Sequence, residues 1–293
     1  MYNRKSLVMF ASSMLIFGTI GLFRRYIPLS SALIAFARGI LGGLFLLFYV
    51  RVRGSGHKEE IPPRYFWRLA VSGAVMGFNW ILLFEAYNYT TVPVATLCYY
   101  MAPTIVVLLS PIIFKEKLTL KKMICAAAAV AGMVLVSGVA GSGVPRGGSL
   151  YGILLGLGAA VLYSVVVIMN KMISGIDAYA KTTVQLLSAG LIMIPYLLLT
   201  KGFRPESFSG QNISLNAVIL LFIVGLVHTG IAYVLYFGSM DGLKAQSIAL
   251  LSYIDPVSAL IFSAIFLREP LSVPGIVGAV MIIGSALISE LAV

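Results

Sequence analysis

The chain has 293 residues, of which 60% are hydrophobic and only 11% are charged, and its formal net charge is +11. Soluble domains carry about 25% charged residues. The composition therefore excludes an ordinary soluble protein and indicates a protein that lies in a lipid bilayer. The basic residues stand in short clusters between apolar runs, so their charge is explained by membrane topology and no nucleic-acid partner is expected.

Ten continuous apolar runs, each 19 to 25 residues long, follow one another along the chain. A helix needs roughly 20 apolar residues to cross the hydrocarbon core of a bilayer. A transmembrane β-barrel would instead show short segments of alternating polarity. The sequence thus predicts an all-α polytopic membrane protein with ten transmembrane helices. The predicted spans are 6–26, 30–50, 67–87, 92–114, 119–140, 149–170, 179–199, 215–238, 243–267 and 273–291.

Positively charged residues divide unequally between the two sides of the predicted bundle. If the N-terminus is cytoplasmic, fourteen of the 21 lysines and arginines fall on the inner side and six on the outer side, while Arg38 lies within a span. Cytoplasmic loops of membrane proteins carry such an excess. We therefore expect a multi-pass protein of the cell (inner, or plasma) membrane with both termini in the cytoplasm.

The sequence contains an internal repeat. Segment 99–119 (YYMAPTIVVLLSPIIFKEKLT) resembles segment 252–272 (SYIDPVSALIFSAIFLREPLS), and the two superimpose at an offset of 153 residues. At this offset Pro103 aligns with Pro256, and glycine and aromatic positions further upstream also match. The shared offset predicts that a five-helix unit has been duplicated.

An odd number of helices in the unit decides the geometry, because the second copy must then lie upside-down relative to the first. We expect two inverted five-helix repeats, residues 1–143 and 144–293. Inverted repeats build many transporters around a midplane site, and helices interrupted at matching places in both halves point to that site. Pro103 and Pro256 are expected to interrupt their helices near mid-bilayer, because proline lacks the backbone donor. The alternative is a packing kink, since proline is common in membrane helices.

These features resemble the drug/metabolite transporter (DMT) superfamily, in its ten-helix branch with two EamA-type domains. The resemblance implies secondary transport of small metabolites, often efflux of amino acids or related compounds, across a bacterial inner membrane by alternating access. It supplies no substrate. In the first span this chain has Phe17-Gly18-Thr19, where the branch often has Trp-Gly. The motif that carries the resemblance is Pro103 followed by Lys115-Glu116-Lys117-Leu118, and Pro256 followed by Arg268-Glu269-Pro270-Leu271.

Asp255 is the sharpest candidate for function. A charged side chain at the centre of a membrane helix costs about 2.5–3.5 kcal/mol on insertion scales, so such residues usually mark a transport pathway or an ion pair. Asp255 lies in mid-span beside Pro256. We expect it to bind a cationic group of the substrate or to take up and release a proton. The alternative is that its carboxylate hydrogen-bonds the backbone that Pro256 loosens.

Three further ionisable residues fall inside predicted spans. Arg38 and Glu85 both lie toward the outer side, which favours an ion pair that locks two helices together. Alternatively, Arg38 anchors a carboxylate and Glu85 serves as an outer gate or ammonium site. His228 is a candidate for proton coupling or gating, although a helix–helix hydrogen bond is the commoner role of a lone membrane histidine.

Aromatic and amide side chains gather at the depth of the two prolines. Tyr99 and Tyr253 each precede a proline by about one turn. Aromatic faces beside a carboxylate hold ammonium groups by cation–π attraction, and they also stack on aromatic metabolites; ordinary packing is the alternative. The predicted substrate-binding residues are Asp255, Tyr99, Tyr253, Trp80, Tyr233 and Asn79.

The function classes can then be compared. The sequence contains no nucleophile with a nearby base and no metal-binding spacing. We therefore do not expect an enzyme with catalytic residues, and we expect no bound metal or cofactor. Channels are more often rings of identical subunits around a filter, whereas two inverted halves in one chain indicate a carrier. Among carriers, export of amino acids or related compounds competes with transport of a choline-like organic cation that uses Asp255 and a tyrosine cage. Expected partners are a small-molecule substrate, the lipid bilayer and protons, in a monomer or weak homodimer.

Overall fold

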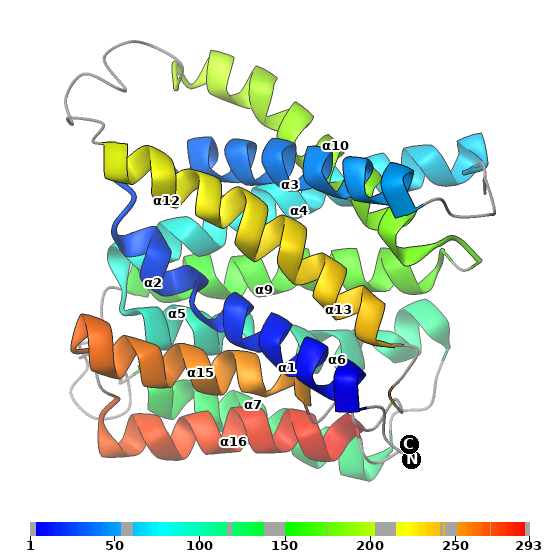
Figure 1. The fold of residues 1–293 in the computed structure, drawn as a ribbon. Helices are drawn as coiled ribbons and strands as arrows, with labels where there is room; N and C mark the ends of the chain where they lie inside the picture. Colours follow the sequence, from blue (N-terminus) through cyan, green and yellow to red (C-terminus); the bar gives the residue numbers. More distant parts are fainter. Residues whose placement is uncertain are drawn as a thin grey trace.

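The computed structural model describes residues 4–53, 61–115, 119–137, 150–173, 175–202, 215–240, 243, 251–269 and 271–290. The regular elements in these ranges are α-helices and two π-helical segments, which confirms the prediction of an all-α fold. The helices run side by side across one bundle (Figure 1).

The first half of the chain supplies five helical spans, two of which are interrupted. The first span is divided at Thr19, and the fourth is divided at Tyr100 and Met101. The elements are α1 (Arg4–Gly18) and α2 (Ile20–Arg25), α3 (Ser31–Arg53), α4 (Pro63–Tyr89), α5 (Val92–Tyr99) and α6 (Ala102–Phe114), and α7 (Leu120–Ser137).

The second half repeats this plan, and the start of its predicted fourth span, 243–267, extends into residues outside the described ranges. Its elements are α9 (Leu150–Lys171), α10 (Ala178–Leu199), α12 (Leu215–Gly225) with the π-helix η1 (Leu226–Ile231) and α13 (Ala232–Met240), α15 (Ile254–Phe262) with the π-helix η2 (Ser263–Leu267), and α16 (Val273–Glu290).

Seven of the described helical spans are long and apolar enough to cross a membrane, and two shorter apolar helices end the chain. With α7 they make the ten helical segments that the sequence predicts. The seven are Arg4–Arg25, Ser31–Val52, Pro63–Tyr89, Val92–Phe114, Leu150–Lys171, Ala178–Leu199 and Leu215–Met240, and the shorter two are Ile254–Leu267 and Val273–Ile288.

Helix packing has the symmetry of a duplicated unit. The second span, α3, packs along its counterpart α10, and the fifth span, α7, packs along its counterpart α16. A further pair of contacts is related by the repeat. The third span of the first repeat, α4, packs on the first span of the second, α9, and α13 of the second repeat packs on α1 of the first. This is the arrangement of two inverted five-helix repeats. The expected boundary between them, at 143 and 144, lies outside the described residues.

Glycine allows the two symmetric helix pairs to approach closely. A Cβ atom on Gly39 of α3 would lie 2.5 Å from the backbone nitrogen of Gly190 in α10. Likewise, a Cβ atom on Gly132 of α7 would lie 2.7 Å from the carbonyl oxygen of Gly278 in α16. Small residues of this kind let the backbones of membrane helices touch, and here they fix the contacts between the repeats.

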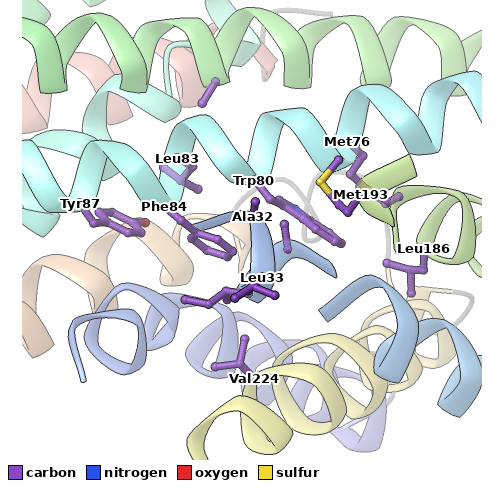
Figure 2. Close-up of a cluster of buried hydrophobic side chains, with 14 of the residues drawn as sticks. Ala32, Leu33, Met76, Trp80, Leu83, Phe84, Tyr87, Leu186, Met193 and Val224 are labelled. Atoms are coloured by element: carbon purple, nitrogen blue, oxygen red, sulfur yellow. The ribbon is translucent and has the colours of Figure 1, made fainter. Parts of the chain in front are cut away.

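The larger of two buried apolar clusters lies where α3, α4 and α10 meet. Figure 2 shows Trp80, Phe84 and Tyr87 projecting from one face of α4 toward Ala32 and Leu33 of α3. These aromatic side chains recur at helical spacing and are nearly inaccessible to solvent. The cluster therefore holds one aromatic wall of the bundle interior in a fixed position.

The two sides of the bundle differ in charge. In Figure 1 the beginning of α1 and the end of α16 lie on the same side, which we call the basic side. Because successive helices alternate in direction, the helix ends on this side carry Arg4, Lys5, Arg51, Arg53, Arg64, Arg68, Lys115, Lys121, Lys122, Lys171 and Lys181. The opposite side carries Arg24, Arg25, Lys201 and Arg268 among the described residues.

The fourth span of each repeat breaks just before its proline. The helix α5 ends at Tyr99, and α6 begins at Ala102 with Pro103 in its first turn. In the second half, Tyr253 lies in a turn before α15, and Pro256 lies in the first turn of that helix. Proline is tolerated there because the backbone nitrogens of the first turn have no partner within the helix. Each interruption therefore leaves polar backbone near the middle of the bundle.

Candidate functional site

A cavity of about 400 Å³ lies inside the bundle, between the two interrupted helices. Its wall contains Asp255 from the second repeat and Arg38 from the first, together with side chains from both halves of the chain. The cavity spans the middle of the bundle: Asn170 and Thr182 line it toward the basic side, and Gly21 and Thr96 line it toward the opposite side. The other polar residues of the wall are Tyr87, Tyr99, Tyr100, Tyr163, Gln185, Tyr233, Tyr236 and Ser252.

Asp255 is positioned by the second helix break. It lies in the first turn of α15, and its carboxylate accepts a hydrogen bond from the hydroxyl group of Tyr100, which belongs to the break in the first repeat. The two interrupted helices are thus joined across the cavity by one polar contact. The alternative was that this carboxylate bonds the backbone loosened by Pro256. Among the described residues it bonds the side chain of Tyr100 instead.

Arg38, on α3, is held in the wall by groups of α4 and η1. Its side chain is 6% exposed, and its guanidinium carbon lies 4.2 Å from the centre of the Trp80 ring. Its Nε donates a hydrogen bond of 2.8 Å to Oγ1 of Thr229, in the π-helical segment η1. Arg38 and Asp255 line the same cavity, but these residues form no ion pair in the described part of the chain.

The prediction of an ion pair between Arg38 and Glu85 is wrong, because the two side chains do not pair among the described residues. Glu85 instead accepts hydrogen bonds from the hydroxyl group of Ser31 at 2.7 Å and from the side-chain amide of Asn88 at 3.2 Å. Arg24 donates to the same two residues. Glu85 therefore belongs to a polar cluster at the end of α4 on the opposite side. Sequence spacing placed Arg38 and Glu85 at similar depth but could not show the direction in which each side chain points.

His228 joins two helices. Its Nε2 lies 2.8 Å from the hydroxyl oxygen of Thr19, and its ring packs edge-on to Phe23 with centroids 4.7 Å apart. Only 2% of the residue is exposed, and it is not among the residues that line the cavity. The geometry is that of the helix–helix hydrogen bond weighed above as the commoner role of a membrane histidine.

The predicted substrate-binding residues divide into two groups. Trp80, Tyr99 and Tyr233 line the cavity together with Asp255. Asn79 does not line it, because this side chain is fully buried and donates a 2.5 Å hydrogen bond to the carbonyl of Ala159 in α9. Asn79 precedes Trp80 directly in the sequence, but one residue along a helix turns the side chain by about 100°.

Tyr253 is likewise not among the lining residues, although it lies in the turn before α15. Tyr100 takes the corresponding place in the wall and reaches Asp255. The sequence drew attention to the tyrosine before each proline, but the break in each helix decides which of these rings faces inward.

Several wall residues were not predicted from the sequence. Tyr163 of α9 packs on Tyr99 with ring centroids 5.1 Å apart. On the facing side, Phe17 packs on Tyr233 at 5.4 Å, so an aromatic ring fills the place where the DMT branch often has tryptophan. Both residues come from the first helix of their repeat, Phe17 from α1 and Tyr163 from α9.

A second cavity of about 400 Å³ adjoins the first toward the basic side. Both cavities are lined by Pro103, Tyr163 and Tyr236. The second one continues past Cys125 to Lys122, near the start of α7. Space inside the bundle therefore extends from the mid-membrane wall toward the basic side.

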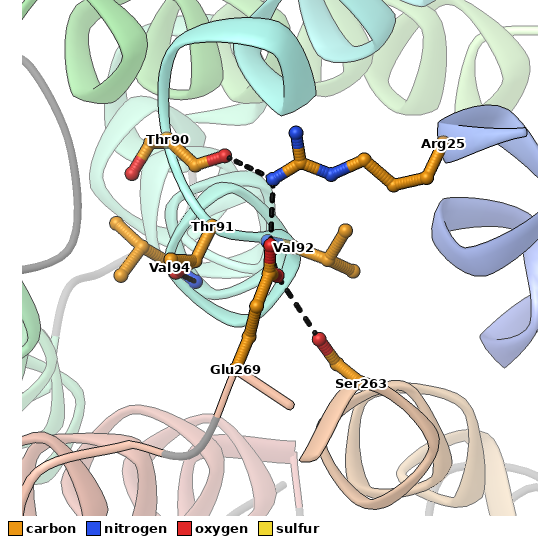
Figure 3. A network of polar contacts seen from close by, with 7 residues as sticks. All are labelled: Arg25, Thr90, Thr91, Val92, Val94, Ser263 and Glu269. Carbon is orange, nitrogen blue, oxygen red and sulfur yellow. Dashed lines mark hydrogen bonds and ion pairs between the residues drawn. The ribbon is translucent and has the colours of Figure 1, made fainter. Parts of the chain in front are cut away.

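The opposite side is held by a contact between the repeats. Figure 3 shows Glu269, which follows η2, between Arg25 of α2 and the beginning of α5. The carboxylate forms an ion pair of 2.7 Å with Arg25 and accepts a 2.9 Å hydrogen bond from the backbone nitrogen of Val92. The repeats are thus joined at this side, while the second cavity lies toward the basic side.

A helical bundle of two repeats that encloses a polar cavity at its broken helices has the architecture of a membrane transport protein. The model of the EamA-like transporter family matches this chain twice, over residues 4–138 and 150–290. The chain belongs to this family, which confirms the resemblance to DMT proteins with two EamA-type domains.

Similar proteins carry transporter names. The "Uncharacterized transporter YxxF" of Bacillus subtilis is 29% identical over 254 residues, which cover 87% of this chain and 79% of that protein. Protein PecM of Dickeya dadantii is 27% identical over 267 residues, covering 90% and 83% of the two chains. A crystal structure with 20% sequence identity matches the fold with a TM-score of 0.64 over 98% of this chain and 99% of that one. The chain is thus a multi-pass membrane protein of a transporter family.

Proposed function

We propose that this protein is a secondary transporter that exports small metabolites, namely amino acids or related compounds, across a bacterial inner membrane. The observation that carries the proposal is the mid-bundle cavity, in which Asp255 and Arg38 bring opposite charges from the two repeats to one wall. Charged side chains are costly inside a membrane and are kept where they serve a pathway. A zwitterionic metabolite is complementary to both charges.

Alternating access is supported by the symmetry of the helix contacts. The pairs α3 with α10 and α7 with α16 relate one repeat to the other, and inverted repeats of this kind move against each other in many transporters. In this proposal the structure represents a state that is closed at the opposite side. The repeats are placed at 1–143 and 144–293, in keeping with the two family matches.

The orientation follows from charge. Because cytoplasmic loops are enriched in lysine and arginine, the basic side faces the cytoplasm, and both termini lie there. The second cavity then extends from the central one toward the cytoplasm, where an exporter collects its substrate. A monomer or weak homodimer would carry out this cycle, with the small-molecule substrate and the bilayer as its partners.

Counterflow into proteoliposomes tests the proposal. Purified protein is reconstituted into vesicles loaded with 10 mM of one amino acid, and uptake of the same radiolabelled compound is measured, for each of the twenty amino acids in turn. A carrier gives transient accumulation that saturates with substrate, whereas empty vesicles give none. Currents at ion-channel rates, or the absence of counterflow for every amino acid and related compound, would contradict the proposal.

A choline-like organic cation is the second candidate substrate, because Asp255 shares the cavity with Tyr99, Tyr100 and Tyr233. Aromatic rings around a carboxylate bind quaternary ammonium groups well. The variant Asp255→Asn distinguishes the two candidates. Binding of a cation should collapse with the charge, whereas a zwitterion held elsewhere should still bind. Selective loss of proton-driven accumulation, with exchange intact, would instead assign Asp255 to proton coupling.

A further inference from the structure

Arg38 has hydrogen-bonding capacity that the protein itself does not use. Its Nε is bonded to Thr229, but the two terminal nitrogens of the guanidinium group donate to none of the residues that the structure describes. The side chain is 94% buried and lines the central cavity. A buried charge without a partner is costly, so this group is suited to bind an anionic group that enters the cavity.

The surroundings fix the plane and the direction of the guanidinium group. Trp80 covers one face at 4.2 Å, and Phe84 lies 5.8 Å away. Thr229 engages the Nε edge and is itself fixed, because its hydroxyl group donates to the carbonyl of Val224 at 3.0 Å. What remains is the edge formed by the two terminal nitrogens. This fork matches the two oxygens of a carboxylate in a planar, bidentate arrangement.

We propose that Arg38 anchors the carboxylate group of the transported compound, so that the substrate class is small carboxylates that also bear an ammonium group. This inference rests on the proposed function. Asp255 lines the same cavity and has the charge needed for an ammonium group. A multiply charged anion such as phosphate would bring negative charge toward Asp255, which disfavours it. Amines without a carboxylate leave Arg38 unpaired and bind poorly.

Thermal shift on the purified full-length protein tests this assignment. The probes are L-amino acids at 10 mM, each compared with the amine that lacks its carboxylate, such as phenylalanine with phenethylamine. We expect at least one amino acid to raise Tm while its amine does not, and Arg38→Met to abolish that shift. Because charged hydrogen bonds are worth about 1.5–3 kcal/mol, Arg38→Lys should weaken Kd by roughly tenfold or more. The control Arg68→Met, on the exposed start of α4, should leave the shift intact.

A second readout needs no ligand. If Arg38 serves binding, Arg38→Met without ligand should have the same Tm as the wild type or a higher one, because an unpaired buried charge is removed. A fall of several degrees would make Arg38 a structural residue and overturn the assignment. Equal shifts with an amino acid and its amine, or no shift with any carboxylate, would overturn it too. Counterflow of some other compound would still leave the transporter proposal standing.

A different observation supports a second inference, at the opposite side of the bundle. Glu269 is contacted from both repeats: Arg25 and the Val92 nitrogen belong to the first, and the hydroxyl group of Ser263, 3.2 Å from Oε2, belongs to the second (Figure 3). Arg25 also donates to the carbonyl of Thr90 at 3.1 Å. We call Arg25, Thr90, Val92, Ser263 and Glu269 the outer latch.

The backbone before Glu269 is shaped for this contact. Arg268 has a φ of 56°, in the left-handed region that costs a non-glycine residue about 1 kcal/mol or more. This turn ends η2 and reverses the chain, so that the Glu269 carboxylate reaches the backbone nitrogen of Val92 at the N-terminus of α5. The first backbone nitrogens of a helix lack partners, and a negative charge there is favourable. Lys115, at the aligned position in the first repeat, has the same conformation, with a φ of 55°.

We infer that the outer latch keeps the opposite side closed and must separate when the transporter opens there. Two of its contacts cross between the repeats, the ion pair of Glu269 with Arg25 and its hydrogen bond from the Val92 nitrogen, so separating the repeats at this side breaks both. Its side chains are partly exposed, 31% for Arg25 and 19% for Glu269. Contacts of this exposure are weak enough to be broken and remade in each cycle.

Cysteine accessibility tests the latch without any substrate. Cys98 and Cys125 are replaced by alanine and Thr96, which lines the cavity near the start of α5, is replaced by cysteine. A membrane-impermeant maleimide is then applied from the opposite side in oriented vesicles. Glu269→Gln should raise the labelling rate about three- to tenfold. The control Lys201→Gln, which removes another charge on the same side, should not.

Arg25→Gln provides the decisive comparison. It should raise labelling to a similar extent, and the double variant should add little, because both changes break one contact. Unchanged labelling in Glu269→Gln, or fully additive effects of Arg25→Gln and Glu269→Gln, would refute the latch. Labelling that rises equally from both sides would indicate general unfolding and would also refute it.

Discussion

Replacing Gly39 by alanine should destabilise the bundle at the contact between the repeats. The new Cβ atom would lie 2.5 Å from the nitrogen and 2.8 Å from the Cα of Gly190, and 2.9 Å from the carbonyl oxygen of Leu186. All three are backbone atoms of α10 and cannot rotate away. To restore an ordinary contact, the two helices must separate by roughly 1 Å, and such overpacking typically costs about 1–3 kcal/mol.

The control is Gly284→Ala in α16, where a Cβ atom would meet nothing within 4 Å. Alanine is better than glycine in a helix by about 0.8–1.0 kcal/mol, so this control should be as stable as the wild type or more so. Both variants share this propensity gain, and their difference isolates the clash. At on the order of 2 °C for each kcal/mol, Gly39→Ala should melt about 2–6 °C below Gly284→Ala.

The assay is thermal unfolding of both variants in the same detergent, followed by counterflow. Because Gly39 is next to Arg38 in α3, moving this helix should also weaken substrate binding. Equal Tm values for Gly39→Ala and Gly284→Ala would refute the close helix contact. A lower Tm with unchanged Kd would show that the shift does not reach the cavity.

Three further predictions follow from individual contacts. His228→Leu should lower Tm by the equivalent of about 1 kcal/mol, because the hydrogen bond to Thr19 is lost. The pH profile of counterflow should stay unchanged; a changed profile would restore His228 as a proton-coupling residue. Asn79→Leu should lower Tm with an unchanged substrate Kd, because its amide bonds α9 outside the cavity; a weaker Kd would contradict this. N-ethylmaleimide should modify Cys125, which lines the second cavity, well before the fully buried Cys98; equal rates would show that this cavity is closed.

Hydrophobic patterning was enough to predict the ten helices, because apolar length decides whether a segment can cross a bilayer. The duplication was predicted from the match of segments 99–119 and 252–272 at one offset. The repeated prolines also predicted where two helices are interrupted, because the missing donor acts on the neighbouring turn wherever the helix lies. The roles of Trp80, Tyr99, Tyr233 and Asp255 as cavity-lining residues followed from their depth beside those breaks, and the structure places all four in one wall.

Side-chain direction could not be predicted in the same way. Arg38 and Glu85 were expected to pair from their depth alone, yet one faces Thr229 and the other faces Ser31. Glu269 follows Arg268 directly in the sequence, but its ion-pair partner is Arg25, 244 positions away. Such pairs depend on how helices from different repeats rotate and pack against each other.

The sequence by itself determined the membrane location, the number of helices, the repeat and the depth of the polar residues. These follow from the transfer of each segment into lipid, which depends on composition along the chain. Only the tertiary structure decided which polar groups meet, which line the cavity and at which side Glu269 joins the two repeats. Those outcomes depend on contacts between distant helices, where a rotation of about 100° per residue separates a wall residue such as Trp80 from a packing residue such as Asn79.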